Sequence, residues 1–164
     1  MFSMHQAASK KRKSTHKSTE VVAIIYLNVK RTQTRVLRVL IDTGASATVI
    51  LGEHCSKLKL KSTAATTWTT KAGTFTTNRK VKLTFLLPEF NQSKEISWKC
   101  HVDDATKAST SRYDMIIGRD LLQALGFIID FNDHTMTWEE ATIPMKDHGT
   151  VSTLQVADAY DICN

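Results

Sequence analysis

Short apolar runs separated by polar turns make up most of the chain between residues 20 and 145. Val21–Val29 is rich in β-branched residues and apolar on both faces, which is typical of a buried strand. Arg35–Ile41 predicts a second strand, and the polar residues between the two runs predict a hairpin connection. Val81–Leu87 and Glu95–Val102 predict two more strands joined by a turn.

The later part of the chain adds a buried strand, a helix and a hairpin. Met115–Ile117 is apolar throughout, and Gly118 after it indicates a close approach of another backbone segment. Arg119–Leu125 predicts a short helix with its leucines on one face, and Gly126 is a natural C-terminal stop. The following residues, 127–140, predict a hairpin that turns at Asn132 and Asp133.

Between these two parts lies a threonine-rich segment. It follows residues 51–60, which predict a short helical turn, and it is nearly symmetric about Lys71–Gly73. Threonine favours strands, and glycine at the tip can adopt a positive φ angle. We therefore expect residues Trp68–Asn78 to form an exposed β-hairpin with small polar arms.

The pattern predicts an all-β domain, barrel-like or sandwich-like, over residues 20–145. Residues 1–19 are expected to form a basic flexible tail and residues 146–164 a C-terminal tail or linker, because both have few large apolar residues. No apolar run approaches the roughly 18 residues that a membrane span needs. The first residues also lack the apolar core of a secretory leader, so we expect no membrane association.

Charge is concentrated at the N-terminus. Of the net charge of +6, residues 1–20 contribute +4, from five basic residues against Glu20. A tail of this kind suits weak contact with nucleic acid or a nuclear-import signal, and equally suits a solvated linker. It has no interleaved aromatic residues that would stack on bases.

Cysteine and histidine spacing gives no metal site. Cys55, Cys100 and Cys163 are widely separated and form no Cys-x-x-Cys pair, which argues against a zinc knuckle. We expect free thiols and a reducing compartment, such as the cytoplasm. The six histidines have neither metal-ligand spacing nor serine and aspartate neighbours typical of a triad. No metal and no cofactor are therefore expected.

The candidate chemistry lies in the turn VLIDTGASATVI, residues 39–50. An apolar strand leads directly into Asp42, and small residues lead out of the turn into another apolar run. Taken alone, Asp-Thr-Gly is a weak signal, since an aspartate at a strand end is often only a turn residue. Its context is more specific, because the block MIIGRDLL follows some seventy residues later with a glycine-tipped hairpin between.

Together, the Asp42 turn and the block YDMIIGRDLLQALGFIIDF resemble the retropepsins, the aspartic proteases of retroviruses and LTR retrotransposons. This block and TWEEATIPM are especially similar to proteases of gypsy-type retrotransposons. The resemblance covers most of residues 20–145. It implies a retropepsin-like acid protease barrel with one short helix, an aspartic endopeptidase activity, and a polypeptide substrate such as a Gag-Pol-type polyprotein.

Hydrolysis by this route requires two carboxyl groups. One must be ionised to accept a proton from water, and the other must be protonated to donate to the scissile carbonyl. Two carboxyls ~3 Å apart cannot both ionise cheaply, so they share one proton. No other aspartate of the chain lies in an Asp-Ser/Thr-Gly turn. We therefore predict an obligate homodimer in which Asp42 faces Asp42 of a second copy.

The resemblance also implies roles for neighbouring residues. Thr43 would hydrogen-bond across the dyad, Gly44 and Ala45 would contact substrate, and Gly118 would pack behind the catalytic loop. The Trp68–Asn78 hairpin would be the flap, and its tip residues would contact substrate. That tip consists of Ala72, Gly73 and Thr74.

Two positions depart from the retroviral pattern. Ser46 stands where retroviral enzymes often have an acid that pairs with the arginine of the Gly-Arg-Asp block, here Arg119. A serine in this place is familiar from pepsin-like turns, where it supports the catalytic aspartate. Arg119 therefore lacks the usual partner, and a plain helix-start residue is its alternative interpretation. Ala72 replaces a glycine common at the flap tip and is expected to stiffen it.

Two other classes of function stay open from the sequence. The chain could be a retropepsin-like dimerisation or interaction module that no longer cleaves, or a nucleic-acid-binding protein that uses its basic tail. No aromatic RNA-binding motif or basic recognition helix supports the second. For a cleaving enzyme of this kind we expect a cytoplasmic location, including virus-like particles.

Overall fold

Seven strands of the computed structural model form one sheet, which is closed in part into a barrel. The structure describes residues 19–30 and 33–147, so the tails expected at 1–19 and 146–164 lie outside it except for Thr19, Lys146 and Asp147. The strand order is β2-β3-β8-β4-β7-β6-β5, and pairing of β2 with β6 closes the first six into a barrel. The strands are β2 (Val22–Lys30), β3 (Gln33–Ile41), β4 (Val49–Leu51), β5 (Leu60–Thr70), β6 (Gly73–Leu87), β7 (Asn91–Asp103) and β8 (Met115–Ile117).

These strands confirm the all-β prediction, and their burial follows the expected alternation. In β6, Val81, Leu83 and Phe85 are buried in the core, whereas Lys82 between them is exposed. The period of two places one face of the strand in the barrel and the other in solvent. The barrel interior is therefore filled by side chains.

Strand β6 is much longer than the sequence pattern predicted. The segment Val81–Leu87 is not a separate strand: β6 runs without a break from Gly73 at the hairpin tip into the barrel. Its tip half pairs with β5, and its other half pairs mainly with β7. No glycine or proline interrupts the strand between Thr74 and Leu87, so nothing breaks the backbone where the side chains change from polar to apolar.

A single α-helix, α1 (Arg119–Leu125), follows β8 in the described part of the chain, as the leucine pattern predicted. Leu121 and Leu122 are buried against the barrel. The helix ends at Gly126, whose φ of 67° lies in the left-handed region, and its N–H donates to the carbonyl of Gln123. Two short 3-10 turns also occur, η1 (Gly52–Cys55), in the segment where a helical turn was expected, and η2 (Ala108–Thr110).

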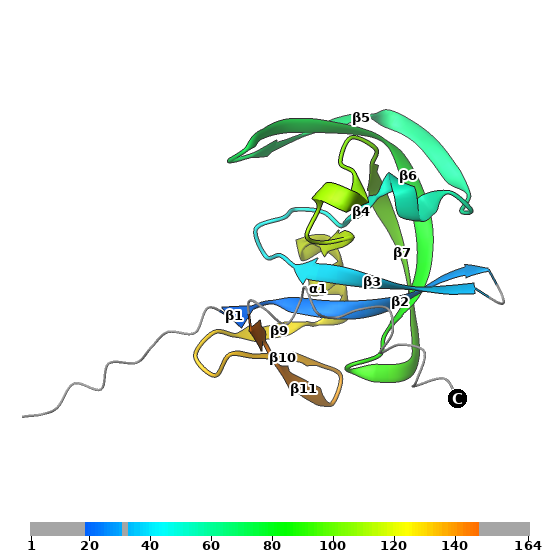
Figure 1. Cartoon of the computed structure of the whole chain (residues 1–164). Helices are drawn as coiled ribbons and strands as arrows, with labels where there is room; N and C mark the ends of the chain where they lie inside the picture. The colour runs from blue at the N-terminus through cyan, green and yellow to red at the C-terminus, as the bar shows by residue number, and fades with distance from the viewer. Residues whose placement is uncertain (1–18, 31–32, 148–164) are drawn as a thin grey trace, which may run out of the picture.

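A second, smaller sheet lies beyond the helix, at the end of the molecule away from the β5–β6 hairpin (Figure 1). Its order is β11-β10-β9, so β9 is an edge strand. The predicted hairpin is present as β9 and β10, but β11 was not expected, because its connecting turn uses Glu139 and Glu140 rather than glycine or asparagine. The strands are β9 (Ile128–Asp130), β10 (Thr135–Trp138) and β11 (Ala141–Pro144), and a separate pair is formed by β1 (Thr19–Glu20) and β12 (Lys146–Asp147).

Strand β8 is the element that positions the Asp42 turn. It pairs in parallel with β3, which enters the turn, and antiparallel with β4, which leaves it. Val39 lies opposite Met115, and Val49 lies opposite Ile116. Because both arms of the turn pair with one central strand, the turn itself is held at a fixed place on the rim of the barrel.

Candidate active site

Asp42 lies at the end of β3 in a tight turn. Its backbone N–H donates to the carbonyl of Ile117 at 3.0 Å, and its own carbonyl accepts from the N–H of Ala45 at 3.2 Å. Within the described residues its carboxylate accepts one hydrogen bond, from the N–H of Gly44 to Oδ1 at 2.8 Å. A Cβ at position 44 would stand 3.0 Å from that same oxygen. The turn therefore holds a half-buried carboxylate with one oxygen fixed by the backbone.

The Gly118 block packs directly behind this turn, as predicted. A Cβ at Gly118 would lie 2.5 Å from the backbone carbonyl of Ala47, so no larger residue fits without displacing the turn. The N–H of Arg119 donates to the carbonyl of Ala45 at 2.9 Å. The start of α1 is thus joined to the candidate catalytic loop through the backbone.

A partly buried polar network behind the turn was not predicted. The Thr48 hydroxyl donates to Asp120 Oδ1 at 2.8 Å and accepts from the N–H of Gly118 at 3.2 Å. Trp98 donates its indole N–H to the other oxygen of Asp120 at 3.1 Å. Thr48 is fully buried, and its two hydroxyl contacts join the turn to the first turn of α1 and to the N-cap of that helix. Two features of the sequence could have indicated this network: a threonine inside an apolar run and the acid next to Arg119.

The candidate flap is the hairpin of β5 and β6, which extends over the loop between β3 and β4 (Figure 1). Thr70 pairs with Gly73, so Lys71 and Ala72 form the turn between the strands. Gly73 has a φ of 129°, which confirms the positive φ expected there. The N–H of Ala72 donates to the Thr70 hydroxyl, which in turn donates to the carbonyl of Gly73. Ala72, Gly73 and Thr74 are all exposed.

The remaining predicted site residues lie on the open side of the turn. Thr43, Ser46 and Arg119 are exposed, and within the described residues neither Ser46 nor the Arg119 side chain has a hydrogen-bond partner. Thr43 and Arg119 line a hollow of about 340 Å³ together with Phe127, Ile129 and Phe131. The structure thus brings Thr43 and Arg119 to one surface, and within the described residues no hydrogen bond joins Ser46 to Asp42.

A charged cluster supports β8 from its other end. The carboxylate of Asp114 accepts from the backbone N–H and guanidinium of Arg38 at 2.8 to 3.3 Å and lies 3.1 Å from His54 Nε2. Burial alone would raise the pKa of Asp114, but the hydrogen bonds from His54 and Arg38 outweigh it and lower the pKa to about 2. The cluster joins β3, η1 and the start of β8.

The described residues contain neither a metal-binding cluster nor a membrane-spanning helix. There, no group of three or more histidine, cysteine, aspartate or glutamate side chains is arranged to hold a metal ion. Within the same residues no helix has the length and apolar character to cross a bilayer. Cys55 and Cys100 are buried and unpaired, and burial raises the pKa of the Cys55 thiol to about 11.

A closed barrel with an Asp-Thr-Gly turn on its rim, a hairpin over that turn and one helix behind it defines the retropepsin-like class of fold. The chain belongs to the retroviral aspartyl protease family, whose model matches residues 17–130. Among curated proteins, no sequence matches the chain at a significant level.

Two solved structures are similar to this chain. The retroviral protease-like domain of Ddi1 from Leishmania major is 15% identical, with a TM-score of 0.51 over 79% of this chain and 95% of that domain. The protease of EIAV, solved with the inhibitor HBY-793, is 24% identical, with a TM-score of 0.45 over 68% of this chain and 92% of the protease. The first supports the assignment of the fold.

Proposed function

We propose that the chain is an aspartic endopeptidase whose active site is completed by a second copy. The observation that carries this proposal is the single Asp42 turn, which presents one carboxylate on the barrel rim beneath a hairpin. Water activation by this route needs a second carboxyl group at about 3 Å. Asp42 of a symmetry-related copy would supply it, and the two groups would share one proton.

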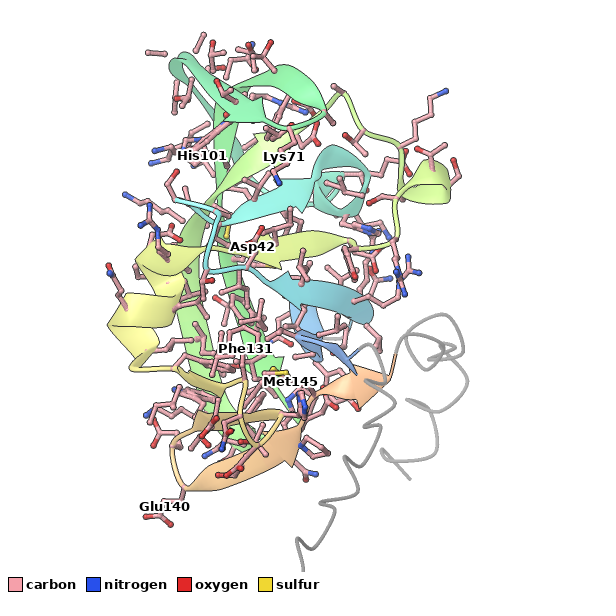
Figure 2. The ribbon with its side chains drawn as sticks, turned by 90° about the vertical axis from the view of Figure 1, so that its left-hand side faces the viewer. Asp42, Lys71, His101, Phe131, Glu140 and Met145 are labelled. Atoms are coloured by element: carbon pink, nitrogen blue, oxygen red, sulfur yellow. The ribbon has the colours of Figure 1, made fainter. Side chains whose placement is uncertain are left out.

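The surface around the turn supports docking of a second copy. Ile128 and Phe131 are the large apolar residues that stay exposed, at 59% and 63%, within the described part of the chain. Figure 2 shows Phe131 on the same face as Asp42, and Phe131 shares the hollow with Thr43. The neighbouring strand β9 has an unpaired edge. An apolar edge beside a catalytic turn is costly in water and favours burial against an identical surface.

The substrate in this proposal is an extended polypeptide. It would lie between the Asp42 turn and the β5–β6 flap, held by main-chain hydrogen bonds in the manner of an added strand. Gly44, Ala45 and the tip residues Ala72–Thr74 would contact it, and closure of the flap would exclude water from the dyad. Thr43 would bond to its counterpart across the two-fold axis, while Gly118 and Arg119 would support the loop.

The biological setting is a further part of the proposal. The similarity of residues 113–131 to gypsy-type sequences favours an element-encoded protease that processes a Gag-Pol-type polyprotein in the cytoplasm or in virus-like particles. Residues 20–145 would form the protease domain, and the basic residues 1–19 would contact nucleic acid weakly.

The test compares the wild-type chain with Asp42→Asn. Both are incubated with a peptide library from about pH 4 to 7, and their mass in solution is measured by sedimentation. We expect cleavage by the wild-type dimer and none by the variant. Equal cleavage by both chains, or an active monomer, would contradict the proposal. A dimer that cleaves nothing would instead identify a non-cleaving interaction module.

A further inference from the structure

A hydrogen-bonded chain of three side chains joins the flap to the barrel. Trp68 on β5 donates its indole N–H to the hydroxyl of Thr77 on β6 at 2.9 Å. The same hydroxyl lies 3.1 Å from Nδ1 of His101 on β7. Thr77 is 2% exposed and His101 is 9% exposed, so water has little access to these contacts. The His101 ring also packs edge-on against Trp68, with centroids 4.8 Å apart.

The indole of Trp68 fixes the direction of the first hydrogen bond, and the tautomer of His101 sets the direction of the second. An indole N–H can only donate, so the Thr77 oxygen accepts from Trp68. When the neutral ring of His101 has its proton on Nε2, Nδ1 carries a lone pair and the Thr77 hydroxyl can donate to it. A protonated ring would present a second donor to the same hydroxyl, and the hydrogen of Thr77 would lose its acceptor.

His101 also connects this chain to the candidate catalytic loop. Its backbone N–H donates to the carbonyl of Thr48 at 3.0 Å, and Thr48 is the residue that holds Asp120 and Gly118. Val49 lies opposite His101 on one side and opposite Ile116 on the other, so these three side chains form a row on one face of the sheet. In Figure 2, His101 and Lys71 of the hairpin tip lie on the same side of Asp42.

Burial and the balance of nearby charges disfavour protonation of His101. Burial lowers the pKa of His101, and the nearby ammonium group of Lys80, its cross-strand neighbour on β6, lowers it further. The carboxylate of Asp120 on α1 opposes this shift. On β7 itself, Asp103 faces the following loop, where it accepts from the N–H groups of Ala105 and Thr106. The groups packed from β4 and β5, Val49 and Trp68, carry no charge.

From this geometry we propose that His101 is a positioning residue for the flap, which in its neutral form holds Thr77 and Trp68 and in its protonated form releases them. This inference rests on the proposed function and adds a regulation of the same site. Protonation would reverse the hydrogen bond at Thr77, free the root of the flap and weaken its closure over the Asp42 turn. Closure of the flap would therefore weaken as the pH falls below about 6.5, the ordinary pKa of histidine.

The first experiment measures the contact without using activity. In the full-length Asp42→Asn chain, the indole N–H signal of Trp68 is followed by NMR between about pH 4.5 and 7.5. We expect the signal to shift with a midpoint below that of an ordinary histidine, while the signal of Trp138, in the hydrophobic core, stays constant. Adding His101→Gln, whose amide oxygen can accept from Thr77 and does not titrate, should abolish the shift. A Trp68 signal that is independent of pH, or that titrates equally with and without the His101→Gln substitution, would overturn the proposal.

The second experiment measures catalysis in the chain with Asp42 intact. We expect the ratio of kcat/KM for His101→Gln to that of wild type to rise as the pH falls from about 7 to 5. Thr77→Val, which removes the hydroxyl, should lose roughly tenfold in kcat/KM relative to wild type at about pH 7 and less at about pH 5, where His101 of wild type is protonated, and Thr77→Ser should restore the neutral-pH value. A ratio that is constant across this range would contradict the switch. Titration of Trp68 in a chain that cleaves nothing would contradict the proposed function and leave the switch standing.

Discussion

The buried residue Thr48 connects several elements of the candidate site. It donates to Asp120 and accepts from the N–H of Gly118, and its backbone carbonyl accepts from His101. The candidate catalytic loop, α1 and β7 thus meet at a residue that is six positions after Asp42. A hydroxyl buried this completely costs free energy unless each of its bonds is made, and here both are made.

Thr48→Val tests this role, since valine keeps the shape and removes both hydrogen bonds. We expect a loss of about 1 to 3 kcal/mol in the free energy of unfolding, because Gly118 and Asp120 each lose a buried partner. Denaturant unfolding measures the change. Thr63→Val is the matched control, since Thr63 is an exposed threonine on β5, and it should leave stability within about 0.5 kcal/mol. Equal effects of the two substitutions would contradict the role of Thr48.

The sequence predicted the residues of the turn better than the residues behind it. Asp42, Gly73 and Gly118 were predicted because a motif, a hairpin tip and a close backbone approach each leave a local signature. Thr48, Asp120 and His101 were not found, because their partners are distant in the chain and only the barrel brings them together. Polar residues whose contacts depend on strand register have no such local signal.

At the scale of elements, the three residues of β8 hold the candidate site in place. Its centre pairs with both arms of the Asp42 turn, and its start is held by the cluster of Asp114, Arg38 and His54. Asp114 also pairs through its backbone, since its N–H donates to the carbonyl of Arg38 and its carbonyl accepts from Leu51. A short strand in this position needs such anchoring to keep its register.

Asp114→Asn should change how the free energy of unfolding depends on pH, because it removes the charge that holds the start of β8. The folded-state pKa of Asp114 lies at about 2, below its ordinary value of 3.8. The ionised carboxylate therefore contributes stability above about pH 4, and this contribution is lost as the pH falls towards 2. We expect the free energy of unfolding of the variant to be roughly 2 kcal/mol below that of wild type near neutral pH. This difference should become smaller as the pH is lowered from about 4 towards 2.

Chemical denaturation at several pH values measures this difference. Asp133→Asn, at an exposed position in the β9–β10 turn, is the control and should follow the wild-type curve. A difference between Asp114→Asn and wild type that does not change between about pH 6 and 3 would mean that the charge of Asp114 is unimportant.

The elements themselves were largely predictable, with two instructive exceptions. Periodicity identified β2, β3, β7, β8 and α1 because each has a clear apolar face or run. It divided β6 in two, since the composition changes from threonine to leucine where the backbone does not change direction. It missed β11, because a turn made of two glutamates carries no recognisable turn chemistry.

The whole molecule presents an asymmetric surface for which a second copy is the proposed partner. The face with the Asp42 turn also carries Phe131, and the edge of β9 lies beside it (Figure 2). No local pattern in the sequence identifies such a face, because Phe131 and Thr43 are separated by most of the domain. The dimer was predicted from chemistry alone, through the absence of a second Asp-Ser/Thr-Gly turn.

Phe131→Glu should separate the copies without unfolding them. Phe131 is 63% exposed, so the barrel core does not depend on it, but a charge in an apolar interface would be desolvated and unpaired. We expect a shift from dimer to monomer in sedimentation and a loss of cleavage, with an unchanged circular dichroism spectrum. Ser109→Glu, at an exposed position in η2, is the matched control and should remain an active dimer. A monomer that still cleaves peptides, or an active dimer of the Phe131 variant, would contradict the interface.

The central claim, that each copy supplies one aspartate to a shared site, is tested most directly by mixing subunits. Wild-type chain is combined with increasing amounts of Asp42→Asn chain at constant total concentration, and peptide cleavage is measured after exchange. If two Asp42 carboxyls form one site, activity follows the square of the wild-type fraction and falls to about a quarter in an equal mixture. A linear fall to about one half would show that one copy is sufficient and would contradict the account.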